Sequence, residues 1–137
     1  MPIIMMVQPD SAPPLILMFL SSLDRKLQHK LDLQIRRLAS TPVSALTEPH
    51  YKHFTIAKYS RLFKLRERGR VLVRIIFTIQ DDGAVILLEP FIKRHKRTTM
   101  QALDSSLKLL MQIEDNPGLL TEYAPYDTLS GKEDPAI

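Results

Sequence analysis

Hydrophobic residues in the middle of the chain alternate or run continuously in patterns typical of β-strands. Almost every residue from Val71 to Ile79 is apolar, and many are β-branched or aromatic, which predicts a strand buried on both faces. Asp81-Asp82-Gly83 then supplies a turn, and Ala84 to Phe91 resumes as a second apolar strand. Upstream, Leu62 to Glu67 alternates between apolar and polar positions before the turn Arg68-Gly69-Arg70. These segments predict a three-stranded antiparallel meander.

Helical periodicity appears on both sides of this meander. Leu15 to Ala39 predicts a short helix started by Pro13-Pro14 and a longer helix capped by Ser21 or Ser22. The apolar face of this segment comprises Leu23, Leu27, Leu31, Ile35 and Leu38. The charged residues off this face predict a solvated surface: Arg25, Lys26, Lys30, Arg36 and Arg37.

A third helix follows the meander. Thr98 or Thr99 is the expected N-cap, and Asn116-Pro117-Gly118 ends the helix. Its expected inward face comprises Met100, Leu103, Leu107, Leu110 and Met111.

Two stretches outside these elements complete the expected fold. Ile3 to Val7 predicts a short edge strand of the same sheet, and residues 42–55 predict a connecting loop. The fold class is therefore α+β, a small antiparallel sheet with two N-terminal helices and one C-terminal helix.

Charge is distributed unevenly along the 137 residues. Lys52 to Arg97 contains 12 Lys and Arg against 4 Asp and Glu, whereas the chain from Glu114 onward contains 6 acids against Lys132 alone. We expect one domain over residues 1–116 and an acidic, proline-containing extension over residues 117–137. Its apolar residues are expected to dock on the domain: Leu119, Leu120, Tyr123 and Tyr126.

Composition narrows the chemistry. The chain has no cysteine, which excludes disulfides and thiolate catalysis, and no apolar segment long enough for a membrane span or an ordinary signal peptide. We therefore expect a cytoplasmic protein. His50 and His53 have a spacing that suits a metal, but no third nitrogen ligand accompanies them, so we expect no metal and no cofactor.

Cations occupy positions on the meander where neutral residues are usual. Lys64 and Arg66 project to the same face because side chains two apart in a strand point the same way. They fit either a phosphate-binding surface or a charged edge strand that resists aggregation. Arg74 interrupts an apolar face, and an unpaired buried guanidinium is unfavourable by several kcal/mol. Arg74 therefore requires either an ion pair, for which Glu89 is the nearest candidate, or an opening to a wet groove.

The third strand of the meander ends in a basic run. Lys93, Arg94, His95, Lys96 and Arg97 follow one another without an acid and precede a helix. Cations next to a helix N-terminus suit a phosphate, although such a run is also typical of a solvated loop. His95 is a candidate general base, because neighbouring cations disfavour its protonated form, and Lys64 is a second candidate for the same reason.

These residues carry a family resemblance that covers about 100 positions. The chain resembles the RelE/ParE superfamily of bacterial toxins, in particular its HigB-like, phage-associated branch. The resemblance extends from the helix at Pro14 to Leu23 as far as the helix ending near Ile113. The motifs are Arg61-Leu62-Phe63-Lys64-Leu65-Arg66, Gly69, Val73-Arg74-Ile75-Ile76-Phe77, Ile86-Leu87-Leu88 and the run from Phe91 to Lys96.

The resemblance implies a toxin of a type II toxin–antitoxin system. RelE-like members cleave mRNA in the ribosomal A site without a metal, and an antitoxin protein blocks the concave face of their sheet. Carried over position by position, the functional cations are Lys64, Arg66, Arg74, Lys93, Arg94 and Lys96. With the candidate base His95 and the rest of the basic run added, we predict Lys64, Arg66, Arg74 and His95 as catalytic residues and Lys93, Arg94, Lys96 and Arg97 as RNA-binding residues. The expected partners are a cognate antitoxin and mRNA on the ribosome.

The chain departs from the pattern of RelE-like members in two respects. Met100 falls where several of them place a tyrosine near the final helix, and the acidic extension exceeds the usual length. Two alternatives stay open: a ParE-like inhibitor of DNA gyrase, or an inactive prophage-derived protein that binds only its antitoxin.

Overall fold

The structure, a computed structural model, describes residues 3–124 and has the predicted α+β architecture. The helices are α1 (Leu15–Ser21), α2 (Arg25–Arg37) and α3 (Lys96–Asp115), and three 3-10 turns are η1 (Val43–Ala45), η2 (Ala57–Tyr59) and η3 (Pro117–Leu119). The strands are β1 (Ile4–Val7), β2 (Tyr51–His53), β3 (Leu62–Arg68), β4 (Leu72–Ile79), β5 (Val85–Ile92) and β6 (Leu120–Glu122).

The strands form one sheet in the order β2-β3-β4-β5-β1-β6. The antiparallel meander β3-β4-β5 is confirmed, with a register shift between Ile75 and Phe77 where β4 faces β5. The expected edge position of β1 is wrong, because this strand pairs in parallel with β5 and antiparallel with β6. The expectation of a plain loop over residues 42–55 is also wrong, since β2 pairs with β3 and removes β3 from the edge.

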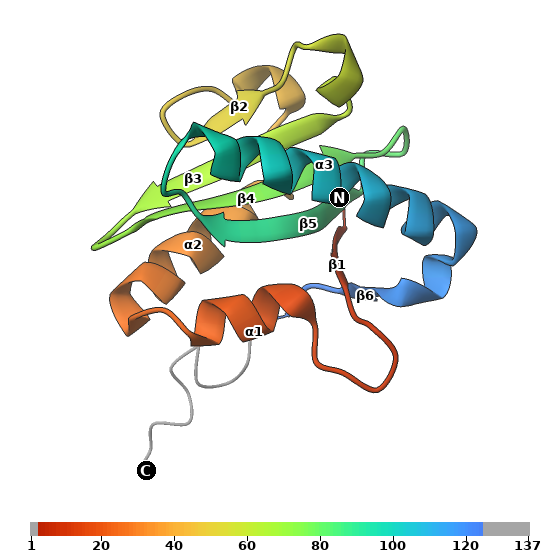
Figure 1. The fold of residues 1–137 in the computed structure, drawn as a ribbon, viewed down its shortest axis with the longest axis horizontal. Helices are drawn as coiled ribbons and strands as arrows, with labels where there is room; N and C mark the ends of the chain where they lie inside the picture. The colour runs from red at the N-terminus through yellow and green to blue at the C-terminus, as the bar shows by residue number, and fades with distance from the viewer. Residues whose placement is uncertain (1–2, 125–137) are drawn as a thin grey trace.

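Helices cover both faces of the sheet, so that β4 is buried on both sides as predicted (Figure 1). One apolar cluster joins α1 and α2 to residues such as Leu65, Ile75 and Leu87, and a second joins α3 to Leu62, Ile76 and other residues of the opposite face. Because successive side chains of a strand point to opposite faces, each one packs either against α1 and α2 or against α3. We call the two sides the α2 face and the α3 face.

The boundary between α1 and α2 differs from the predicted one. Asp24, in extended conformation, is the N-cap of α2, and its carboxylate accepts a hydrogen bond from the Leu27 backbone N–H at 2.9 Å. The hydroxyls of Ser21 and Ser22 instead donate to carbonyl oxygens within α1. Both serines therefore belong to the end of the first helix, and the predicted caps are wrong.

The α3 helix also begins earlier and faces inward differently than predicted. His95 is its N-cap residue, so the predicted caps Thr98 and Thr99 lie in its first turns. Met100 and Met111 are 43% and 64% exposed, contrary to expectation. The buried positions of α3 are Ala102, Leu103, Ser106, Leu110 and Ile113. The small side chains at two of these positions let the helix lie close to the sheet, which an apolarity pattern weighted toward large residues misses.

The start of the acidic extension completes the sheet through β6, beyond the predicted domain boundary at residue 116. Tyr123 is 9% exposed, and its hydroxyl donates to the carboxylate of Asp32 on α2 at 2.6 Å. Leu120 packs against the α3-face cluster, so docking of the extension is confirmed at these two residues. Tyr126 lies outside the described residues.

Candidate nucleic-acid interface

The register of the meander brings the predicted strand cations to one face. Arg66 pairs directly with Arg74 across β3 and β4, and Lys64, two residues from Arg66, shares its face. Lys64 and Arg74 are each 7% exposed, and Arg66 is half-buried. Lys64 pairs with Ile76, a residue of the cluster under α3, so these cations lie on the α3 face.

Arg74 reaches from the sheet to the beginning of α3. Its Nη1 donates to the hydroxyl of Thr99 at 3.0 Å, while its buried Nε has no hydrogen-bond partner. The alternative of an ion pair with Glu89 is wrong: no such pair forms, and burial alone raises the pKa of the Glu89 carboxyl. The guanidinium is thus held by a neutral hydroxyl, and its charge is not neutralised by a direct ion pair within residues 3–124.

Burial and like charges depress the basicity of these groups. Burial, and then the nearby charges of Arg74 and Lys52, lower the pKa of Lys64 to about 8, although Glu48 acts in the opposite direction. The pKa of Arg74 is also lowered, first by burial and then by Arg66. An amine whose pKa lies this close to neutrality can exchange a proton at physiological pH, which an ordinary lysine does poorly.

The basic run after β5 divides into two parts. Lys93 extends the β-ladder, since its N–H donates to the carbonyl oxygen of Leu72 at 2.8 Å, and Arg74 is the main cause of its lowered pKa. The charge of Lys93 therefore interacts with the charges of the meander cations. The rest of the run, from Arg94 to Arg97, is exposed.

His95 caps α3, and its backbone N–H donates to Thr98 Oγ1 at 3.4 Å. Lys96 and Arg97 occupy the first turn of α3, which contains no acid. The positive end of the helix dipole repels these cations, whereas a bound anion would be stabilised by the cations and by the dipole. The structure thus brings Lys64, Arg66, Arg74 and Lys93 together, and places the remaining predicted site residues at the adjacent helix start, exposed to solvent.

A comparison with protein families tests the resemblance directly. The family described as "Phage derived protein Gp49-like" matches residues 18–110, about two thirds of the chain. The protein belongs to the Gp49-like family. This family of phage-derived proteins is a HigB-like toxin family within the RelE/ParE-type toxins. No curated protein sequence matches the chain.

The residues matched by the Gp49-like family include every predicted site residue, both on the strands and at the start of α3, and the match ends within α3. It therefore includes the whole meander and both N-terminal helices apart from the start of α1. The strands β1 and β6 lie outside the matched residues. No helix among residues 3–124 is long and apolar enough to cross a membrane.

Sequence reasoning missed three residues of the interface. Lys52 on β2 pairs with Lys64 and carries a fourth cation onto the same face. Glu48, in the loop before β2, is the acid whose charge acts on both Lys64 and Arg74. Thr99, a predicted cap, instead accepts the hydrogen bond from Arg74. The three-residue strand β2 has no periodicity of its own, so its position follows from pairing with β3 alone.

His50 and His53 serve the scaffold. His50 Nδ1 lies 3.8 Å from Glu67 Oε2, and the ring of His53 stacks on Phe63 with centroids 4.3 Å apart. Residues 3–124 contain no cluster of three or more His, Cys, Asp or Glu side chains that could hold a metal ion. Both histidines instead attach β2 and the preceding loop to β3.

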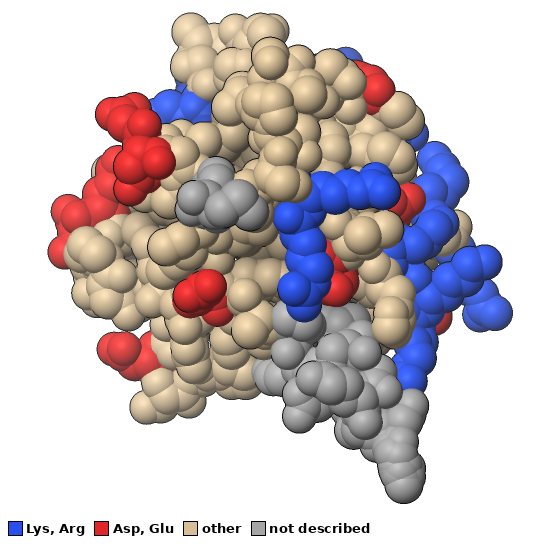
Figure 2. Space-filling model, turned by 180° about the vertical axis from the view of Figure 1, so that it is seen from behind, with Lys and Arg blue, Asp and Glu red and all other residues tan. Residues whose placement is uncertain are grey.

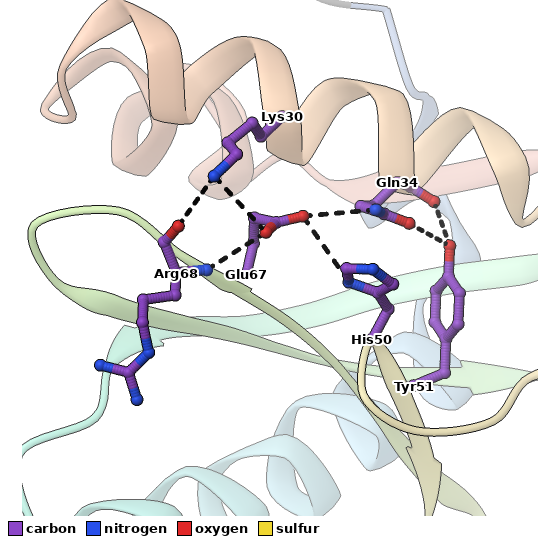
Figure 3. A network of polar contacts seen from close by, with 6 residues as sticks. All are labelled: Lys30, Gln34, His50, Tyr51, Glu67 and Arg68. Atoms are coloured by element: carbon purple, nitrogen blue, oxygen red, sulfur yellow. Dashed lines mark hydrogen bonds and ion pairs between the residues drawn. The ribbon is translucent and has the colours of Figure 1, made fainter.

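A polar network on the α2 face holds the same loop in place (Figure 3). The buried carboxylate of Glu67 accepts a hydrogen bond from Gln34 Nε2 at 3.3 Å and lies 3.9 Å from Lys30 Nζ. Tyr51 donates to the side-chain oxygen of Gln34 at 2.8 Å, which links β2 to α2. Because Glu67 follows Arg66 on β3, the network anchors the strand that carries the cations on the other face.

Proposed function

We propose that this protein is the toxin of a type II toxin–antitoxin system and that it cleaves mRNA on the ribosome as a metal-independent endoribonuclease. The observation that carries the proposal is the state of Lys64. This residue is 7% exposed, the pKa of its amine is lowered to about 8, and it shares one face with two guanidinium groups. A structural lysine gains nothing from such surroundings, whereas a proton acceptor does.

The proposed reaction uses the RNA's own 2'-hydroxyl as nucleophile. Lys64 in its neutral form takes the proton of this hydroxyl, the 2' oxygen attacks phosphorus, and the bond from phosphorus to the 5' oxygen breaks. The products are a 2',3'-cyclic phosphate and a 5'-hydroxyl, and the leaving oxygen receives a proton from an acid. We assign this acid to the start of α3, with His95 as the first candidate and Lys93, whose pKa is lowered, as the second.

Arg66 and Arg74 are the proposed stabilisers of the phosphorane. Charge accumulates on the non-bridging oxygens as the 2' oxygen attacks, and preorganised donors at that position contribute about 10²- to 10³-fold each. Thr99 accepts a hydrogen bond from Nη1 of Arg74 and so fixes the orientation of the guanidinium, whose buried Nε has no hydrogen-bond partner. General acid and general base add about 10²- to 10⁴-fold each.

The proposed partner is a cognate antitoxin that covers the α3 face. Because Lys52, Lys64, Arg66 and Arg74 gather there without direct ion pairs in the described part of the chain, an inhibitor is expected to place acidic side chains against them. A small DNA-binding protein encoded beside this toxin would fit that role.

Induction of the protein in a bacterial host tests the proposal. Primer extension on ribosome-bound mRNA is expected to reveal new 5' ends together with growth arrest. Lys64→Met, Arg66→Met and Arg74→Met should abolish both effects, while Lys108→Met, which removes an exposed cation of α3, should retain them. Intact transcripts beside a loss of DNA supercoiling would refute the nuclease and favour a gyrase inhibitor. Normal growth with intact transcripts would leave only antitoxin binding.

A further inference from the structure

Two cavities lined by cations adjoin at the end of the sheet where β3 turns into β4. The first, of about 600 Å³, lies between this turn and the start of α2, and Lys26, Lys30 and Arg70 contribute its cations together with Arg25. The second, of about 530 Å³, lies between the same turn and the end of β5. Its cations are Arg68, Arg70, Lys93 and Arg94. Arg70 is common to both cavities.

We call the cations Lys26, Lys30, Arg68, Arg70, Lys93 and Arg94 the sheet-end band. Figure 2 shows Lys and Arg side chains gathered along one side of the face opposite α3, the side toward which the β3–β4 turn points in Figure 1. The largest acidic cluster visible on that face lies toward the other side, and smaller acidic areas lie beside the cations. The sequence predicted a plain solvated surface for Lys26 and Lys30, but the fold places both beside the cations of the turn.

Close packing holds the turn against α2. A Cβ atom on Gly69 would lie 3.2 Å from Leu27 Cδ2, so the absence of a side chain permits this approach. Lys30 Nζ donates to the carbonyl oxygen of Arg68 at 3.0 Å and fastens the two elements from the other side. The backbone that carries the band is therefore held in place by these contacts, while the long side chains extend from it.

The sheet-end band continues into the candidate interface through Lys93. The charges of Arg74 and Arg66 both lower the pKa of this lysine, so it is electrostatically coupled to the α3 face. At the same time Lys93 lines the second cavity with Arg70 and Arg94. Cations thus line a path from the proposed cleavage site, around the sheet end, to α2, with Asp24 also lining the first cavity and Glu67 Oε1 3.9 Å from Lys30 Nζ.

We propose that the sheet-end band binds the phosphate backbone of nucleotides that flank the cleaved linkage. A single RNA strand then passes from the α3 face, around the β3–β4 turn, to the start of α2. The assignment of the cleaved linkage to the α3 face rests on the proposed function, whereas binding of the strand by the band is measurable without cleavage.

The features of the band favour a single nucleic-acid strand over a duplex or a protein partner. A path that turns around the end of one small sheet suits a flexible strand, while a duplex with a persistence length of about 150 base pairs cannot follow it. The residues that line both cavities include no aromatic side chain for base stacking, so the contacts fall on phosphates and carry no sequence preference. None of the exposed large apolar residues within residues 3–124 lines either cavity. A protein partner would therefore find no apolar side chain there to bury at the centre of an interface.

Binding of fully 2'-O-methylated RNA tests the inference, because this RNA lacks the hydroxyl needed for its own cleavage. Oligonucleotides of about 4 and about 16 nucleotides bracket the site sizes usual for single-strand binding. We expect the longer RNA to bind wild-type protein more tightly, with little dependence on base composition. Each phosphate contact contributes about 0.7 to the slope of log affinity against log salt, which corresponds to about fivefold in affinity at about 0.1 M salt.

Arg70→Ala and Lys26→Ala are each expected to remove one such contact. Both should lose about fivefold for the longer RNA and about 0.7 in salt slope, with little change for the short RNA. Lys108→Ala removes the same charge from α3 about 18 Å beyond the start of that helix and should change neither value. Thermal unfolding of each variant checks that the fold is intact, which we expect because both residues lie on the surface.

Three results would overturn the inference. These are equal losses in Lys108→Ala and Arg70→Ala, no gain in affinity with RNA length, and preferential binding of an acidic peptide over the RNA. A different result would contradict the proposed function alone. If Lys64→Met remains fully toxic, Lys64 is not the general base of a toxic nuclease. If the longer RNA still binds wild-type protein more tightly and Arg70→Ala still loses this gain, the band binds RNA all the same.

Discussion

Arg66 and Arg74 stand directly opposite each other on neighbouring antiparallel strands, and neither forms an ion pair with a carboxylate of residues 3–124. Like charges in this arrangement destabilise a sheet. Burial adds to the effect, because it is the main cause of the lowered pKa of Arg74. Stability alone would favour an apolar residue or an acid at either position. The proposed binding of an anionic ligand on this face would account for the pair.

Replacing Arg74 should separate stability from function. Arg74→Met keeps much of the side-chain volume and removes the unpartnered Nε and the repulsion with Arg66. We expect the free energy of unfolding to rise by about 0.5 to 1 kcal/mol, and RNA cleavage to fall by about 10² to 10³. Denaturant titration and cleavage of ribosome-bound mRNA measure the two quantities.

Arg61→Met is the matched control for this variant. Arg61 forms an exposed ion pair with Glu114 at 2.9 Å, away from the interface. Its loss should lower the free energy of unfolding by at most about 1 kcal/mol and leave cleavage unchanged. If Arg74→Met instead proves less stable and still cleaves, the guanidinium is a structural group held by Thr99.

The pKa of Lys64 predicts the pH dependence of cleavage. A general base acts in its neutral form, and an amine with a pKa of about 8 is mostly protonated below that pH. The rate should rise with pH, increase about tenfold per pH unit well below the pKa, and level off above pH 8. Lys64→Arg should lose this inflection along with most of the activity, because an arginine stays protonated throughout.

A second variant moves the inflection without removing the base. Lys52 lies across the ladder from Lys64, and its charge contributes to the lowered pKa. In Lys52→Met the neutral form of Lys64 is less favoured, so the inflection should shift to higher pH while the plateau rate changes little. An inflection that stays in place would show that another group, with His95 as the first candidate, takes the proton.

The buried Glu67 network is expected to be essential for stability. Glu67→Ala leaves Gln34 Nε2 without its acceptor and removes the carboxylate near His50 and Lys30. We expect a loss of about 2 to 3 kcal/mol in the free energy of unfolding, since unsatisfied buried groups remain. Glu122→Ala, at an exposed position of β6, should change it by less than about 0.5 kcal/mol. Equal effects of the two substitutions would show that water satisfies the network.

The meander and its cations could be predicted because strand alternation is a local property. Two apolar faces on β4 imply layers on both sides, and a spacing of two places Lys64 and Arg66 together whatever the rest of the chain does. The Arg66–Arg74 register then follows from the short turn between β3 and β4.

Features held by tertiary contacts alone could not be predicted. The strands β2 and β6 have three residues each, so they carry no usable periodicity and exist through pairing with β3 and β1. The start of α3 lies inside a basic run that lacks an ordinary cap, and the link from Arg74 to Thr99 requires that helix to be placed over the sheet. Lys52 was missed for the same reason.

The contact of Tyr123 with Asp32 predicts a loss of stability in alkali. Burial and the hydrogen bond to Asp32 raise the pKa of the Tyr123 phenol, and burial raises that of Tyr51. An unfolded chain releases these protons near pH 10, whereas the folded protein retains them. The folded state therefore binds more protons above pH 10, and its stability falls there by up to about 1.4 kcal/mol per pH unit and group.

Tyr123→Phe should lower the free energy of unfolding at neutral pH and make its decrease with pH in alkali less steep. At neutral pH the variant loses a hydrogen bond to a carboxylate, which lowers the free energy of unfolding by about 1.5 to 3 kcal/mol. Between about pH 10 and pH 11.5 its stability should fall less steeply than that of the wild type, because one titrating group is gone. Ile75→Val, which loses about 0.5 to 1.5 kcal/mol from the core without an ionisable group, should keep the wild-type slope. Parallel curves for Tyr123→Phe and the wild type would show that the phenol ionises freely, and that the end of β6 is not held on α2 in solution.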